Sequence, residues 1–370
     1  MFRNIFFPFV LIFFAACSTK NLTNDSGLIS VEYDTIQIPI TERYLQNYSH
    51  ITGYSSDSLD LIYAYNHFLH KMDVFDVTNR RCFNSIPLER EGPDGINVAV
   101  NFTVCDSMIY INSFPFYYGI NFSGKIETKL DQTKIINFPY NDFNLSGRRG
   151  IIMANFMEAF VNCEYKAMPV AVYKNDNSLH GIGFIRLDSG TFEMFDVSLP
   201  EIKDNYGHLE IPHINWVGDK IIYNFPYSSS IYVYSIDERT QKEIKVNSVF
   251  TKNIADKLNN NSNMIAQMHH QMFSLQFLSV KYDPFRDLYY RIHMAPINNM
   301  DEMFDRELYL TVMDNQFNCL KELKLPRGIA SPSYVITKNG ILFQLNPSAI
   351  TNADENIMYL MHVEISRDIE

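Results

Sequence analysis

Arginine and histidine side chains between the apolar, strand-like runs are the residues of this sequence best suited to bind a ligand. A guanidinium donates several hydrogen bonds in a fixed fork, and an imidazole can donate or accept near neutral pH, so both suit polar or anionic ligands. Residues of these types are also common in loops that simply face water. The candidate ligand-binding residues are His67, Arg90, Asp94, Arg148, His208, His270 and Arg291.

Arg291 has the most informative surroundings of these candidates. In the run DLYYRIHM, apolar residues alternate with Tyr289, Arg291 and His293. A strand with this alternation has one apolar face and one polar face. A buried arginine must be paired, because an unpaired charge in the interior is too costly to persist. Arg291 is therefore either a structural donor or a ligand contact.

The spacing of the histidines gives little support for a metal site. His269 and His270 are adjacent, so their side chains would point apart on a strand, and the five-residue spacing of His208 and His213 puts them on opposite faces of a strand. The sequence contains no G-x-S-x-G, P-loop or HExxH motif. We therefore expect no bound metal and no cofactor, and we recognise no set of catalytic residues in the sequence.

The strand-like runs that must position these residues form a repeat. They occur in groups of three, such as SMIYINSF, YYGINFSGK and KIETKLDQ within residues 107–132. Each group follows a segment that could form a fourth, inner strand. Six such units lie at spacings of roughly 40 to 55 residues, the range of propeller blades. The sequence thus predicts an all-β fold, a six-bladed β-propeller, with a pair of β-sandwiches as the alternative.

The sixth unit lacks an outer strand at the C-terminus, and a strand-like run at residues 30–40 has no partner. We expect this N-terminal strand to complete the last blade by pairing Val31–Ile38 with Met358–Ile365, which closes the ring and removes exposed edges. Residues 253–272 could hold a short helix, inserted between the fourth and fifth blades. Loops that enter inner strands, and loops between second and third strands, would gather at one mouth of the channel, where we expect the candidate residues of the loops.

Composition limits the partners of the protein. The net charge of −11 and the lack of a basic tract disfavour a nucleic-acid partner. Beyond Cys17, the cysteines are Cys82, Cys105, Cys163 and Cys319. None forms a C-x-x-C pair, so zinc ribbons and thioredoxin-type sites are unsupported. A large domain does not need disulfides, and we expect most of these thiols to be free and buried.

The N-terminus predicts export and anchoring. Arg3 precedes an apolar run that ends in FAAC, and this run is about half the length of a membrane-spanning helix. FAAC resembles a bacterial lipobox, in which the cysteine is acylated and becomes the first residue of the mature chain. We expect a signal peptide at residues 1–16, lipidation at Cys17, a flexible tether at 17–29 and one propeller domain at 30–370. A chance cysteine beside an ordinary cleavage site is the alternative. The expected location is the cell envelope, on the outer membrane facing the periplasm, with surface exposure possible.

Two further stretches resemble known families. EREGPDGI, at residues 89–96, resembles the Gly-Pro-Gly loop that joins an outer strand to the next inner strand in TolB-like and NHL-like six-bladed propellers. VKYDPFRDLYYRIHM, at residues 280–294, is similar to a tract in Bacteroidetes lipoproteins that share a domain of unknown function. This resemblance implies a lipid-anchored six-bladed propeller and implies no activity.

Two functions agree with these features. The first is a non-catalytic binding module for a peptide, glycan or envelope protein. The second is an envelope hydrolase or lyase with its site in the propeller funnel, and fold alone cannot choose between them. Three short segments, DTI, DSL and DSM, also resemble the O-glycosylation signal of Bacteroidetes secretory proteins, with Thr35, Ser58 and Ser107 as acceptors.

Overall fold

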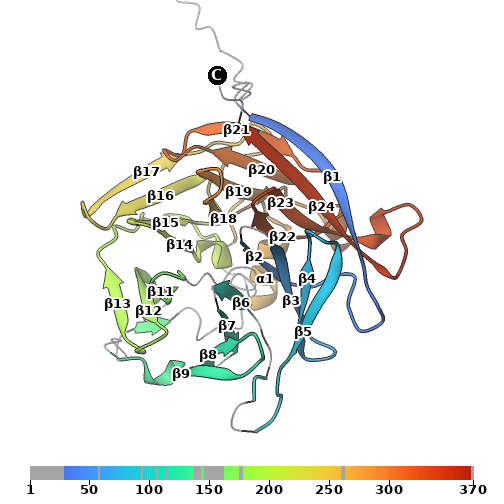
Figure 1. Cartoon of the computed structure of the whole chain (residues 1–370). Coiled ribbons are helices and arrows are strands. Elements are labelled where there is room, and N and C mark those ends of the chain that lie inside the picture. The colour runs from blue at the N-terminus through green and yellow to red at the C-terminus, as the bar shows by residue number, and fades with distance from the viewer. Residues whose placement is uncertain are drawn as a thin grey trace, which may run out of the picture.

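The computed structural model describes residues 29–367 apart from residues 57–58, 93–94, 98, 100, 106, 114, 137–142, 146–161, 175–177 and 260–262. Its strands form six four-stranded sheets, arranged around a common centre as the blades of a propeller (Figure 1). The six-bladed β-propeller predicted from the sequence repeat is confirmed. Among the described residues, no helix is long and apolar enough to span a membrane.

Blades 1 to 5 are each built from four strands that follow one another along the chain, from the inner to the outer edge. Blade 1 contains β2 (Ile51–Ser55), β3 (Asp60–Asn66), β4 (Lys71–Asp76) and β5 (Arg81–Pro87). Blade 2 contains β6 (Asn101–Cys105), β7 (Met108–Ser113), β8 (Phe116–Asn121) and β9 (Ile126–Asp131). Blade 3 contains β10 (Phe143–Leu145), β11 (Ala167–Lys174), β12 (Leu179–Arg186) and β13 (Phe192–Phe195).

The next two blades keep the same order. Blade 4 contains β14 (His213–Val217), β15 (Lys220–Asn224), β16 (Ser230–Ser235) and β17 (Thr240–Lys245). Blade 5 contains β18 (Gln276–Asp283), β19 (Leu288–Met294), β20 (Leu308–Met313) and β21 (Cys319–Lys324). The helix expected within residues 253–272 is α1 (Met264–Phe273), and the side chain of Asn263 caps it by accepting from the Ala266 N–H.

Blade 6 joins the two ends of the chain. Its inner strands are β22 (Ile329–Thr337), β23 (Gly340–Leu345) and β24 (Ile357–Arg367), and its outer strand is β1 (Ile29–Pro39). β1 runs antiparallel to β24 along its whole length, with Val31 opposite Ile365 and Ile38 opposite Met358 (Figure 1). The predicted closure and its register are confirmed.

The hydrophobic core lies between neighbouring blades. Six clusters of buried side chains each draw residues from two adjacent blades, around the whole ring. The strand period of two explains this arrangement, because successive side chains point to opposite faces of a sheet. On β19, Tyr290 and Ile292 pack toward blade 6, whereas Tyr289 packs toward blade 4. Both faces of each blade are therefore covered.

The two ends of the ring carry different connections. Chain segments that pass from one blade to the next, such as residues 88–100, lie on the same end as the turns between second and third strands, such as residues 67–70. We call this end the crossover face. Turns between first and second strands, and between third and fourth strands, lie on the other end, which we call the hairpin face. Because β1 is antiparallel to β24, it begins on the hairpin face.

The cysteines differ from expectation. Cys105, at the end of β6, and Cys163, before β11, form a disulfide across 58 residues of sequence. Among the described cysteines, Cys82 and Cys319 take no part in a disulfide, and both are half-buried. Spacing along the sequence could not reveal the pair, because the ring brings Cys105 of blade 2 beside the segment that precedes β11 in blade 3. The expectation that most of these thiols would be free and buried was wrong.

The segment at residues 89–96 joins β5 to β6, an outer strand to the next inner strand, as its resemblance to the Gly-Pro-Gly loop implied. The N–H of Ile96 donates to the carbonyl of Glu89 at 2.8 Å, which closes the turn. Gly92 has a φ of 89°, a conformation that favours glycine.

Candidate functional site

The loop candidates that the structure describes fall into two separate pairs on the crossover face. His67 is exposed beside the 70 % exposed ring of Phe68, and Nη2 of Arg90 donates to the His67 and Phe68 carbonyls at 3.2 and 3.4 Å. His208 lies in a 3-10 turn, η4 (Gly207–Glu210), that packs against α1, the helix that carries His270. The structure thus brings His67 to Arg90, and it brings the elements of His208 and His270 together.

Two histidines lie on a helix instead of a strand. His269 and His270 are consecutive residues of α1, and the Nε2 atom of His270 lies 2.7 Å from the carbonyl oxygen of Asp256. His208 lies before β14 rather than on it, and burial lowers its pKa. The strand-based argument about these side chains was therefore wrong. The described residues nevertheless hold no group of three or more His, Cys, Asp or Glu side chains that could bind a metal.

The other candidates occupy varied positions. Cys17, Asp94, Arg148 and Ser58 lie outside the described residues. Thr35 is exposed on the outer strand β1, and Ser107 is exposed between β6 and β7. Both hydroxyls are therefore accessible to a modifying enzyme.

Arg291 lies inside the protein, between blades 4 and 5. Its side chain is fully buried, and burial lowers its pKa to about 10. Its Nη1 and Nη2 atoms donate to the carbonyls of Ser229 and Val246, each at 2.7 Å, and its guanidinium lies 4.8 Å from the centre of the Phe277 ring. These contacts fit the structural alternative, in which Arg291 supplies hydrogen bonds to the neighbouring blade.

A hydroxyl, an imidazole and a carboxylate meet beside Arg291. The Nε2 atom of His293 lies 3.3 Å from Ser248 Oγ, and its Nδ1 atom lies 3.7 Å from Glu322 Oε1. This is the order of groups in an acyl-transfer triad. However, the His293 ring is fully buried and stacked between Phe277 and Tyr309. A substrate has no path to an imidazole enclosed in this way. We therefore infer that the cluster has a structural role and stabilises the contact between blades 4 and 5.

A groove on the hairpin face, between blades 6 and 1, is the candidate binding site. Its volume is about 470 Å³. Strands β1 and β24 form one side, blade 1 forms the other, and the turns after β18 and β22 reach its edge. The residues that line it are Asp34, Ile36, Asp60, Val77, Thr78, Arg80, Arg286, Thr337, Lys338, Asn339, Leu342, His362, Glu364 and Ile365.

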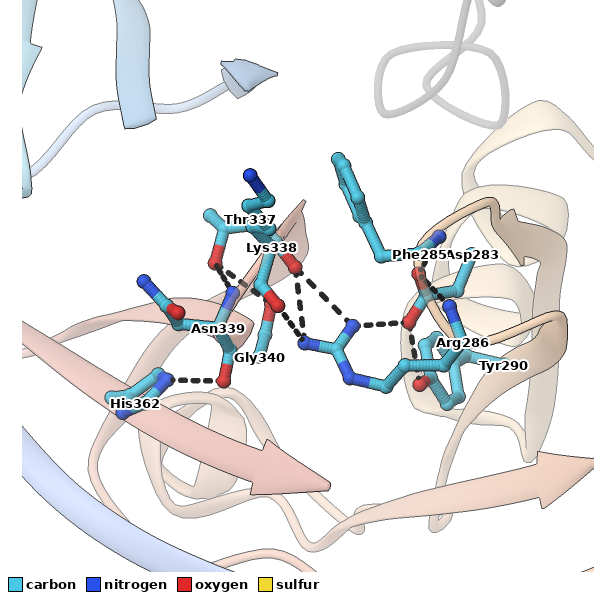
Figure 2. Close-up of polar contacts among 9 residues, drawn as sticks. All are labelled: Asp283, Phe285, Arg286, Tyr290, Thr337, Lys338, Asn339, Gly340 and His362. Atoms are coloured by element: carbon cyan, nitrogen blue, oxygen red, sulfur yellow. Dashed lines mark hydrogen bonds and ion pairs between the residues drawn. The ribbon is translucent and has the colours of Figure 1, made fainter. Parts of the chain in front are cut away.

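Arg286 fixes one edge of this groove (Figure 2). From the turn after β18, its guanidinium reaches blade 6 and donates to the Thr337 carbonyl at 3.1 and 3.2 Å and to the Lys338 carbonyl at 2.9 Å. The same guanidinium forms an ion pair with Asp283, a fully buried carboxylate that also accepts from the Tyr290 hydroxyl at 2.7 Å. A charge-assisted bond of this kind is strong and directional, so the β22–β23 turn is held in place.

Asn339 connects the two sides of the groove. Its Nδ2 atom donates to Oδ2 of Asp60, in blade 1, over a long 3.4 Å. Its carbonyl oxygen lies 3.1 Å from Nε2 of His362, as Figure 2 shows. His362 of β24 stands directly opposite Asp34 of β1 in the strand register. Side chains directly opposite in a sheet lie on one face, so this histidine and carboxylate face the groove together.

Charges of both signs line the groove. Asp34, Asp60 and Glu364 supply carboxylates, while Arg80, Arg286 and Lys338 supply cations. Ile36, Val77 and Leu342 add an apolar part. Such a surface can bind a polar ligand by hydrogen bonds and ion pairs, with apolar contacts at its base.

Sequence reasoning missed this groove because it directed attention to the opposite face. One signal of the groove was present in the sequence. The residues KNG, at 338–340, are typical of a tight hairpin turn, so they predict that Lys338 and Asn339 lie at the end of a hairpin, beside the next blade. The contribution of Asp60 had no such signal, because it depends on how blades 6 and 1 meet.

Comparison with models of known protein families identifies the family of this chain. The model of a domain of unknown function, DUF4221, matches residues 19–324. The chain belongs to the DUF4221 family. This result agrees with the tract at residues 280–294, which suggested Bacteroidetes lipoproteins with a domain of unknown function.

Solved structures agree on the fold of this DUF4221 protein. A DUF4221 member from Bacteroides vulgatus is similar with a TM-score of 0.70 and 16% identity, over 92% of this chain and 99% of that one. A protein from Bacteroides fragilis that is named as a candidate exported protein is similar with a TM-score of 0.51 and 12% identity. The match covers 91% of this chain and 96% of that one. Among curated proteins, none matches. At these identities the likeness concerns the fold alone.

Proposed function

We propose that this DUF4221 protein is a lipid-anchored binding module of the cell envelope that presents its groove to a peptide, glycan or envelope protein. The observation that carries the proposal is the groove itself. Its polar side chains stand on strands of two packed blades and on a turn fixed by Arg286. Groups held in place before a ligand arrives cost less to order on binding.

Envelope location has three supports. The FAAC sequence at residues 14–17 fits lipidation at Cys17, with residues 1–16 as the signal peptide and 17–29 as the tether to the domain at 30–370. The similar protein from Bacteroides fragilis carries a provisional name as an exported protein. The disulfide between Cys105 and Cys163 is of a kind that forms and persists in oxidising compartments.

The anchor would hold the groove toward the membrane. β1 begins at Ile29 on the hairpin face, the face that carries the groove. A chain of 12 residues, from 18 to 29, spans at most about 40 Å when fully extended. The groove would therefore meet ligands close to the membrane surface.

Site-specific photo-crosslinking in the native envelope tests this proposal. A photoreactive amino acid replaces Thr78, an exposed residue that lines the groove, in the full chain. The matched control replaces Thr240, an exposed residue of blade 4 on the same face. We expect a discrete crosslinked species from position 78 alone. Equal crosslinking from both positions, or none from position 78, would overturn the proposed site.

Fatty-acid labelling tests the anchor separately. Cys17→Ser removes the thiol that the lipid would modify. We expect the wild-type chain to incorporate a labelled fatty acid and the variant to remain unlabelled and unprocessed. Label retained by the variant would show that the anchor was assigned wrongly.

A further inference from the structure

Asp60 carries a buried carboxylate that the protein itself does not satisfy. The residue is 6 % exposed, and its Oδ1 atom has no hydrogen-bond partner. Its Oδ2 atom accepts only the long bond from Asn339, and across the described part of the chain no ion pair involves it. Buried carboxylates are nearly always paired, because removing their hydration is costly. Asp60 thus requires an explanation.

Asp60 differs from Asp73 of blade 1 and Asp283 of blade 5, two carboxylates that are fully buried. Asp73 accepts from the Tyr48 hydroxyl, the Asn66 amide and the Ser85 hydroxyl and pairs with Lys71. Asp283 has the partners described above. Both are satisfied inside the protein, whereas Asp60 lines an open groove.

We propose that Asp60 is the anionic anchor for a ligand that carries a primary amine or a guanidinium group, a proposal that rests on the groove being the binding site. Asn339 is exposed, and at 3.4 Å its amide makes a weak bond to Asp60. A cationic donor forms a shorter and stronger bond to a carboxylate than a neutral amide does. The ligand would therefore displace the amide of Asn339 and take its place at Asp60.

The surroundings favour a cation in this position. Asp34 and Glu364 contribute carboxylates to the same groove, on the exposed parts of β1 and β24. Of the three cations that line the groove, Arg286 is already paired with Asp283, and among the described residues no ion pair joins Arg80 or Lys338 to Asp60. The protein as a whole carries a net charge of −11, which attracts cationic ligands during encounter.

Calorimetry on the full chain, purified in detergent, tests the chemistry with matched probes. N-acetyl-lysine methylamide and N-acetyl-arginine methylamide are compared with the neutral analogue N-acetyl-norleucine methylamide, putrescine with butane-1,4-diol, and glucosamine with N-acetylglucosamine. We expect at least one amine to bind and its neutral partner to bind about 10- to 100-fold more weakly. The three arms distinguish a peptide side chain, a free polyamine and an amino sugar as sources of the amine.

Two variants test the residue. Asp60→Asn should weaken the amine by about 10- to 100-fold while preserving or raising the melting temperature, because it removes an unsatisfied buried charge. A purely structural Asp60 would instead lower the melting temperature and leave binding intact, which would overturn the proposal. Asn339→Ala removes the competing amide and should strengthen amine binding or leave it unchanged. A loss of binding in that variant would show that Asn339, not Asp60, holds the ligand.

The outcomes separate this inference from the proposed function. Crosslinks at position 78 without any preference for amines would preserve the groove as a binding site and refute the cationic ligand. Amine binding that Asp60→Asn does not alter would refute Asp60 as the anchor.

Discussion

Arg291 of blade 5 donates a hydrogen bond from Nη1 to the backbone carbonyl of Ser229 in blade 4, over 2.7 Å. The bond joins two separate four-stranded sheets. A second bond, from Nη2 to the carbonyl of Val246, ties the same guanidinium to the chain that leaves β17. The buried charge therefore links blade 4 to blade 5 at two points.

Replacing Arg291 by methionine should destabilise the propeller by about 2 to 4 kcal/mol, because two carbonyls lose buried donors that water cannot replace. Urea unfolding followed by circular dichroism measures this change. The control is Arg239→Met, which changes an exposed arginine in the turn between β16 and β17. Equal stability of the two variants would contradict a structural role for Arg291.

Two buried histidines should make the protein less stable in acid. Burial, then the charge of Arg291, lowers the pKa of His293 to about 3, and burial, then Lys281, lowers the pKa of His50 to about 4. An unfolded chain would hold both near 6.5. The unfolded state thus binds more protons below pH 6.5, so the free energy of unfolding falls as pH falls toward 4. Each histidine contributes a slope of at most about 1.4 kcal/mol per pH unit.

The contribution of His293 can be isolated by urea unfolding between pH 5 and 6.5. His293→Phe keeps an aromatic ring between Phe277 and Tyr309 but cannot titrate. We expect its stability to depend less steeply on pH, by at most about 1.4 kcal/mol per unit, a difference approached at the acidic end of this range. Phe277→Leu disturbs the same packing and keeps the histidine, so it should retain the wild-type slope. Glu322, whose pKa burial raises, is present in both variants. Parallel slopes in all three proteins would contradict the prediction.

The blade architecture could be predicted because it depends on a local pattern repeated along the chain. Alternating runs predicted the strands, and the unpaired run at residues 30–40 predicted the partner of β24. The alternation around Arg291 also predicted that its side chain must find an acceptor. These inferences needed only the period of a strand and the cost of an unpaired edge or charge.

The groove could not be predicted in the same way. Asp60 and Asn339 are far apart in sequence, and their proximity depends on the packing of blade 6 against blade 1. The disulfide has the same origin, since Cys105 and Cys163 meet only after blades 2 and 3 are packed. The histidines of α1 were misplaced because a short helix was read with strand geometry.

Ring closure by β1 should be essential for solubility. Deleting residues 30–40 would leave β24, an 11-residue strand, with an unpaired edge. An exposed edge of this length invites pairing with other chains. We expect aggregation on size-exclusion chromatography and early proteolytic cuts within blade 6. The control deletes residues 18–28, which contribute to none of the described strands, and should remain monodisperse. A monodisperse, protease-resistant protein without residues 30–40 would contradict the prediction.

The disulfide should stabilise the junction of blades 2 and 3. Cys105 and Cys163 enclose a long stretch of chain, with a sequence separation of 58, so their bond restricts the unfolded chain strongly. Cys163→Ser should therefore lower the free energy of unfolding by about 2 to 4 kcal/mol. Cys82→Ser is the matched control, because Cys82 is a half-buried free thiol that closes no loop. Thiol titration of the unfolded, non-reduced chain provides an independent check, since Cys82 and Cys319 should react, whereas Cys105, Cys163 and a lipid-modified Cys17 should not. Reaction of Cys105 and Cys163 under these conditions, or equal stability of the two variants, would show that this bond does not hold the blades together.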